Sequence, residues 1–222
     1  MLLRHHKEGH TSYRLIAIVI SCLANLALWA SPIDSLFVQI PNTILPQLST
    51  SVRLDMLDYW NAGQTERAVG TTVMLSDVRL VSKDDTCLTL QLSPTCTWQL
   101  VRLKTKRADQ YIILETPSNG LCGTFAARYD SRWQPSALSL PALPAAALCT
   151  IPDSLADEKR RALQEALQRA AVFWTWSSEK CALIAQIATA TLTTETKETV
   201  QRYARELTAQ WNGKTFAVEQ RK

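Results

Sequence analysis

The three histidines of this 222-residue chain, His5, His6 and His10, all precede an apolar segment near the N-terminus. If residues 1–30 are removed as an export signal, as predicted below, the remaining chain has no imidazole. That excludes Ser-His-Asp and Cys-His catalysis and any zinc site with a histidine ligand. A carboxylate pair, a Ser-Lys dyad or an isolated nucleophile remains as a route to catalysis.

Two acids, Asp55 and Asp58, lie three residues apart in a predicted helix and can present two carboxylates together. A hydrolase or glycosidase without histidine would use such a pair. We interpret both as part of a solvated helix face, because exposed acids are the norm. Residues 129–131 are typical of a strand-end turn with Asx-type hydrogen bonding, so Ser131 is not predicted to be a reactive serine.

Motifs for phosphates and cofactors are absent from the sequence, which has no G-x-G-x-x-G, no P-loop and no G-x-S-x-G. The glycines after Gly63 are Gly70, Gly120, Gly123 and Gly213, which is too few for a phosphate-cradling loop. We therefore predict no catalytic residue, no metal site and no cofactor.

Basic residues cluster at 159–161 and at 104–107. These clusters are typical of a solvated helix face and a hairpin tip, and acidic lipid head groups are the alternative ligand. Removing residues 1–30 takes three basic residues and one acid from the 24 and 20 of the whole chain. A balance this even predicts no nucleic-acid partner.

Five cysteines follow the apolar segment: Cys87, Cys96, Cys122, Cys149 and Cys181. No pair has C-x-x-C spacing, so neither a redox motif nor a zinc knuckle is indicated. One or two disulfides in an oxidising compartment and buried free thiols are both consistent with the pattern, and the pairing stays open. Hairpin geometry places Cys87 opposite about Val101, which argues against a bond to Cys96.

Trp174 and Trp176 lie on one face of a predicted strand. Such a pair is a weak candidate for a stacking platform that binds a sugar. Burial in the core is the favoured interpretation, because aromatic side chains dominate core packing. Their exposure decides between the two.

The N-terminus has the pattern of a targeting signal. A basic region with Arg4, Lys7 and Arg14 precedes the apolar residues 15–30, a run shorter than the roughly 20 residues of a spanning helix. We predict a signal peptide at residues 1–30, or a lipoprotein signal that ends before Cys22, since residues 19–22 resemble a lipobox. The apolar residues after Cys22 argue against lipidation, and an uncleaved anchor is the remaining alternative.

Alternating apolar and polar residues predict strands at residues 73–81, 86–92, 96–104, 110–116 and 123–129. The turns between them are too short for parallel crossovers, so the strands form an antiparallel meander. Strands 172–177 and 182–191 are predicted to extend the same sheet, and helices 52–62 and 195–207 to cover one face of it. The predicted fold class is α+β: an antiparallel β-meander sheet with helices packed on one face.

The pattern also predicts which faces of one strand and one helix are apolar. In the strand at 96–104, Trp98 and Leu100 share one face while Val101 and Leu103 share the other, which indicates a bulge near Leu100 or a strand buried on both faces. In helix 52–62, the predicted apolar stripe is Leu54, Leu57 and Trp60, which repeat at helical spacing.

Residues 31–218 are long enough for one α+β domain with a real core. The alternative is two units, 31–134 and 151–218, joined by the uncharged loop 135–152, which is rich in proline and alanine.

Three segments, residues 53–59, 129–135 and 211–216, resemble a family of uncharacterised exported proteins from Bacteroidales-type bacteria. The resemblance implies an envelope or secreted location. It brings no catalytic residues, because that family has no assigned activity.

The functional hypothesis is an exported cell-envelope protein, periplasmic, outer-membrane-associated or secreted, that is a non-enzymatic binding module. Its partner is a protein, peptide, glycan or lipid, and it meets the membrane only through an N-terminal lipid anchor. A carboxylate-based hydrolase or glycosidase is the alternative, and two acids facing each other about 5–10 Å apart across a cleft would support it. A structural lipoprotein, dependent on Cys22, is a third hypothesis.

We predict that the protein is exported with removal of its signal. Intact-mass measurement of the protein from its native host is expected to give an N-terminus at Ser31, or a lipid-bearing Cys22 if the lipobox is used. A mature chain that begins at Met1 would contradict export.

Overall fold

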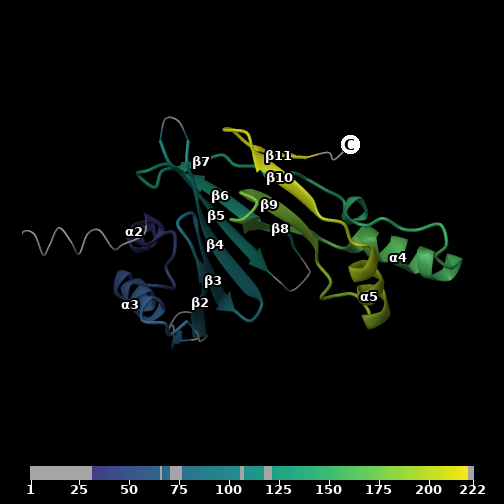
Figure 1. Ribbon diagram of the computed structural model, residues 1–222, viewed down its shortest axis with the longest axis horizontal. Coiled ribbons are helices and arrows are strands. Elements are labelled where there is room, and N and C mark those ends of the chain that lie inside the picture. Colours follow the sequence, from purple (N-terminus) through teal and green to yellow (C-terminus); the bar gives the residue numbers. More distant parts are fainter. Residues whose placement is uncertain (1–31, 66, 71–76, 106–107, 118–121, 220–222) are drawn as a thin grey trace, which may run out of the picture.

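The computed structural model describes residues 32–65, 67–70, 77–105, 108–117 and 122–219. The predicted signal, including Cys22, and the first residues of the predicted strand 73–81 lie outside these ranges. The described chain contains two antiparallel sheets and several helices (Figure 1). This α+β fold, with strands as the larger part, confirms the predicted fold class.

The first sheet has seven strands in sequential order, which is the predicted meander. They are β1 (Ala68–Gly70), β2 (Asp77–Lys83), β3 (Cys87–Ser93), β4 (Cys96–Leu103), β5 (Gln110–Pro117), β6 (Phe125–Tyr129) and β7 (Pro135–Ser136). Cys87 lies opposite Val101, as predicted from the hairpin. The register of β3 and β4 runs unbroken past Leu100, so β4 has no bulge there and is instead buried on both faces.

The second sheet corrects the prediction of one shared sheet. Its order is β11-β10-β9-β8, with β8 (Val172–Ser177), β9 (Ala182–Ile187), β10 (Leu207–Trp211) and β11 (Phe216–Val218). The predicted helix 195–207 is also too long, because α5 (Thr194–Tyr203) ends where the Arg205 amide donates to the Leu148 carbonyl oxygen at 2.8 Å. The chain leaves the helix after Tyr203, and Leu207 is the first residue of β10.

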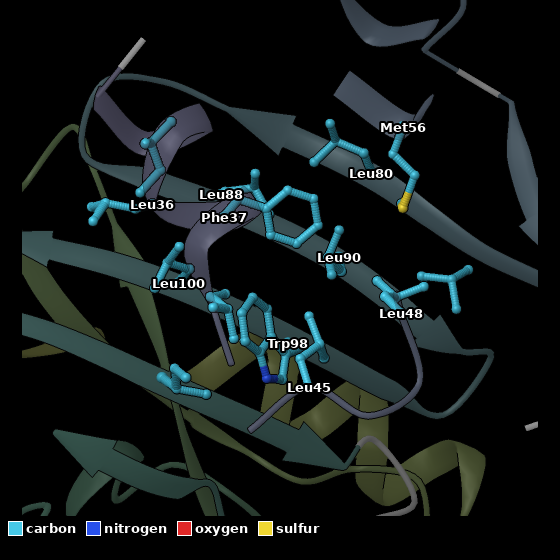
Figure 2. Packing of buried hydrophobic residues seen from close by; sticks show 14 of the residues in the cluster. Leu36, Phe37, Leu45, Leu48, Met56, Leu80, Leu88, Leu90, Trp98 and Leu100 are labelled. Atoms are coloured by element: carbon cyan, nitrogen blue, oxygen red, sulfur yellow. The ribbon is translucent and has the colours of Figure 1, made fainter. Parts of the chain in front are cut away.

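Two helices cover one face of the first sheet, α2 (Pro32–Gln39) and α3 (Thr50–Asn61), on the left in Figure 1. Figure 2 shows the apolar core beneath them, where Phe37 of α2 and Met56 of α3 meet the inward residues of the central strands. Leu45 and Leu48, from the connection between the two helices, are 1% and 0% exposed and pack over Trp98 and its neighbours.

The other face of the first sheet packs against the second sheet. Val101, Ile112 and Leu114 meet Trp174, Leu183 and Ala209 in one buried cluster. The remaining helices, α4 (Asp157–Arg169) and α5, lie at the far end with the short 3-10 helix η1 (Ala145–Leu148), and Leu163, Leu167 and Val200 form their small core. The protein is therefore layered, with helices, a large sheet and a small sheet in succession (Figure 1).

Side chains from β4 and from the segment just before β6 hydrogen-bond to the backbone of β8, an edge strand of the second sheet. The amide of Gln99 accepts from Trp176 N at 2.8 Å and donates to Trp176 O at 3.3 Å. Thr124 does the same for Trp174, accepting from its N–H at 2.7 Å and donating to its carbonyl at 2.9 Å. The outward backbone groups of Trp174 and Trp176 are thus satisfied without another strand.

The approach of the two sheets is close enough to require a glycine at one point. A Cβ atom at position 123 would lie 2.8 Å from the carbonyl oxygen of Val172, a distance that real Cβ atoms do not adopt. Gly123 therefore lets the segment that leads into β6 approach β8, so that Thr124 can form its hydrogen bonds to Trp174.

We predict that Gln99→Leu destabilises the domain by roughly 2–4 kcal/mol, because it leaves the N–H and carbonyl of Trp176 buried and unpaired. Denaturant unfolding measures the loss. Gln186→Leu, at an exposed position of β9, is the matched control and is expected to change stability by about 0.5 kcal/mol or less. Equal unfolding midpoints for the two variants would contradict a structural role for the Gln99 amide.

Candidate functional site

The two tryptophans proposed as a sugar platform are in the core between the sheets. Trp174 and Trp176 are 3% and 8% exposed, and the Trp174 indole donates to the Pro141 carbonyl oxygen at 3.2 Å. Trp176 packs edge-on to Phe216, with ring centroids 6.4 Å apart. Burial, the favoured interpretation, is correct, and neither ring offers a face for stacking.

The turn at residues 130–134 has the predicted Asx-type bonding. The Asp130 carboxylate accepts from the amides of Arg132 and Gln134 at 2.8 and 2.9 Å, and these bonds lower its pKa. Ser131 is exposed beside this turn. The turn fixes the end of β6 and assembles no catalytic group around the serine.

Carboxyl groups that act as general acids need a raised pKa. The carboxyl pKa shifts that are resolved among the described residues go the other way. Hydrogen bonds outweigh desolvation and lower the pKa of Asp84, and the bond and charge of Lys159 lower that of Glu195. Asp55 and Asp58 are both exposed on α3, as expected for a solvated face.

The basic residues at 159–161 interact with nearby parts of the protein itself. Lys159 pairs with Glu195 of α5 at 2.9 Å, and Arg160 donates to the carbonyl oxygens of Pro152 and Leu155 before the helix. Within the described residues, no group of three or more His, Cys, Asp or Glu side chains is placed to hold a metal ion. None of the helices described there has the length and apolar character to cross a membrane.

The five described cysteines are all free thiols. Burial raises the pKa of Cys87 to about 12 and that of Cys96 to about 11, so neither forms the reactive thiolate at neutral pH. Cys87 has the role of a small apolar residue between the sheets.

Helix α3 departs from the predicted apolar stripe. Leu57 is buried as expected, but Leu54 is 46% exposed, and Met56, outside the predicted stripe, is buried. Arg53 takes the place of Leu54 on the core side and is 0% exposed. The buried face of α3 is therefore Arg53, Met56, Leu57 and Trp60, which also has helical spacing.

The buried guanidinium of Arg53 closes the C-terminal end of α2. One terminal nitrogen donates to the carbonyl oxygens of Phe37 at 2.9 Å and Ile40 at 2.5 Å, and the other donates to Asn42 Oδ1 at 2.7 Å. Carbonyls at the end of a helix have no partner within the helix, so these bonds satisfy groups that would otherwise be buried and unpaired. Desolvation lowers the pKa of Arg53 from its usual value.

A groove of about 430 Å³ lies between α2 and α3. We call it the α2–α3 groove; its lining residues are Asp34, Ser35, Val38, Gln39, Leu54, Leu57, Asp58 and Asn61. Its apolar part comes from Val38, Leu54 and Leu57, and its acidic part from Asp34 and Asp58. Volumes of about 300–1,000 Å³ are typical of ligand sites, so the groove is large enough to receive several side chains.

Polar groups cluster at one end of the groove. Lys83 of β2 bridges Asp34 Oδ2 at 2.8 Å and Asn61 Oδ1 at 3.0 Å. The second oxygen of Asp34, Oδ1, is buried with no hydrogen-bond partner among the described residues. A buried acceptor left in this way costs about 1–3 kcal/mol, and a donor from a bound molecule would recover that cost.

Sequence reasoning missed this groove because it assigned Leu54 to the core and did not consider Arg53. The signal that was available is the spacing of residues 53, 56, 57 and 60, which competes with the stripe 54, 57 and 60 for the same helix face. Hydrophobicity favours burial of residues 54, 57 and 60. The hydrogen bonds of Arg53 instead select the face formed by residues 53, 56, 57 and 60.

Comparison with known proteins gives a family and a fold. A family model described as "Protein of unknown function (DUF3256)" matches residues 25–216. Among solved structures, the chain is similar to a domain of an uncharacterized protein from Porphyromonas gingivalis W83, with a TM-score of 0.63 and 16% identity over 86% of this chain and 100% of that one. At that identity the likeness shows the fold alone. No curated protein matches.

We predict that Arg53→Met destabilises the domain by roughly 2–4 kcal/mol, since the carbonyls of Phe37 and Ile40 lose their donor while buried. Arg53→Lys is expected to recover only part of the loss, because an ammonium group lacks the planar fork. Thermal and denaturant unfolding measure both. Arg161→Met, an exposed arginine on α4, is the control, and a loss no greater than that of the control would contradict the role of Arg53.

Proposed function

The chain belongs to the family described as "Protein of unknown function (DUF3256)", and we propose that it is an exported, non-enzymatic binding module that holds a peptide segment of a partner protein in the α2–α3 groove. The predicted signal at residues 1–30 supports export to the cell envelope. The resemblance to exported Bacteroidales proteins supports the same location.

The observation that carries this proposal is the orientation of α3. Turning the helix by about one residue, roughly 100°, would bury Leu54 and expose Arg53, which is the favourable arrangement for a helix taken alone. The protein adopts the opposite arrangement, with Leu54 46% exposed and Arg53 at 0%. A departure from local preference of this kind is typical of functional sites.

Charge indicates what the occupant carries. The exposed carboxylate of Asp58 lines the groove, and Asp55 lies on the exposed surface of the same helix. The lysine nearest the groove, Lys83, is already committed to Asp34 and Asn61. An amphipathic helix with apolar side chains for Leu54 and Val38, and with lysine or arginine beside them, complements this surface.

The carboxylate-based hydrolase is the weaker hypothesis. A retaining or inverting glycosidase needs one carboxyl group kept protonated near neutral pH. In this protein Asp34 is engaged by Lys83, and the candidate pair Asp55 and Asp58 is exposed on α3. These facts favour a binding role for the groove.

We predict that the protein binds a synthetic amphipathic helical peptide of leucine and lysine, and binds its leucine–glutamate counterpart at least about tenfold more weakly. Leu54→Lys is expected to lower the affinity for the lysine peptide by about tenfold or more, because it removes an apolar anchor and adds a like charge. Fluorescence anisotropy with labelled peptides measures the affinities.

Phe125→Lys is the matched control for this experiment, because Phe125 is 62% exposed and lies on β6, outside the groove. Its affinity for the lysine peptide is expected to equal that of the unchanged protein. Equal affinity for the two peptides, or equal loss from Leu54→Lys and Phe125→Lys, would refute the groove as the binding site.

A further inference from the structure

A second groove, of about 600 Å³, lies where α5 meets the strands of the small sheet. We propose that this groove binds a single fatty acid, with the acyl chain on the sheet and the carboxylate beside Lys197 and Arg205. This inference is independent of the α2–α3 groove, with which it shares no lining residue.

The groove is formed by the face of the small sheet that points away from the large one. Along β8, Trp174 and Trp176 point toward the large sheet. Phe173 alternates with them along the strand and therefore points away from the large sheet. Ile184 of β9 is on the same outer face, and both side chains are only partly buried. Val200 and Ala204, near the end of α5, form the adjoining apolar wall.

The charges around the groove are unequal. Lys197 and Arg205 are exposed basic residues in its lining. The acid in the lining, Glu206, is paired with Lys180 from the β8–β9 turn. A largely apolar groove with two cations and one neutralised acid complements an apolar chain that ends in one negative charge.

Arg205 is held in place before any ligand binds. Its Nε donates to the Ala147 carbonyl oxygen at 2.6 Å, and its backbone amide donates to the Leu148 carbonyl oxygen at 2.8 Å. A side chain oriented by such bonds loses less conformational freedom when it meets a carboxylate, which favours binding.

Two other occupants fit less well. An extended peptide would add to a sheet through a free strand edge, but the outer edge of β8 is already bonded to Gln99 and Thr124. A membrane surface is attracted by clusters of about 4–8 basic residues, and this groove has two. A monomeric anionic amphiphile is the occupant that the groove matches in shape and charge.

The test is isothermal titration with laurate below its micellar concentration, with methyl laurate as the neutral probe. Laurate is expected to bind with one site per chain, and methyl laurate at least about fivefold more weakly, because it lacks the charge. Lys197→Glu is expected to lower the affinity for laurate by about tenfold. Lys104→Glu, at an exposed position just after β4, is expected to leave that affinity unchanged. Ile184→Glu, which places a charge on the apolar floor, is expected to abolish binding.

Several outcomes would overturn the proposal: no laurate binding to the unchanged protein, equal affinity for the methyl ester, or equal effects of Lys197→Glu and Lys104→Glu. Binding to anionic phospholipid vesicles without binding to monomeric laurate would assign the surface to membranes and would also overturn it. Leu54→Lys keeps the two proposals separate, because it is expected to leave laurate affinity unchanged while it weakens peptide binding.

Discussion

The arrangement of the whole protein depends on β4 and β5 being buried on both faces. Trp98 and Tyr111 point toward the helices, while Val101 and Ile112 point toward the second sheet. A strand of this kind needs a cover on each side, and the chain supplies α2 and α3 for one side and β8–β11 for the other. Two buried polar residues on the second side, Gln99 of β4 and Thr116 of β5, hydrogen-bond to the backbone of β8. Together with Thr124, they help to set the position of one sheet on the other.

Arg53 has a similar effect on the helical side. Its hydrogen bonds join the N-terminal part of α3 to the end of α2, and they fix both the distance between the helices and the rotation of α3. A groove that is open and partly apolar follows from that rotation, because Leu54 then faces Val38 across the space between the helices. The same apolar residue would close the groove if α3 were free to turn. A charged residue in the core thus keeps an apolar residue at the surface, which is the reverse of the usual division of roles.

The first sheet could be predicted from the sequence because its information is local. Alternation located β3 to β6, short turns required an antiparallel meander, and hairpin geometry placed Cys87 opposite Val101. The second sheet could not be separated from the first in this way. What separates them is a set of side-chain bonds from Gln99 and Thr124 to a strand about fifty to eighty residues later, and side-chain–backbone bonds leave no periodic signal. The candidate groove was missed for a related reason, since hydrophobic periodicity ranks leucine above arginine for a core position and does not count the carbonyls that an arginine can satisfy.

The two proposed sites differ in the charge of their rims more than in the chemistry of their floors. Both have apolar floors of similar chemistry, so apolar contact alone would not tell one ligand from another. Their rims differ in sign, with Asp58 at one and Lys197 and Arg205 at the other. A cationic amphiphile meets repulsion at the second groove, and an anionic one meets it at the first. Helices α2 and α3, which line one groove, and α5, which lines the other, lie at opposite ends of the molecule (Figure 1). Each rim can therefore act without cancelling the field of the other, because charges farther apart than about 8 Å are largely screened at physiological salt.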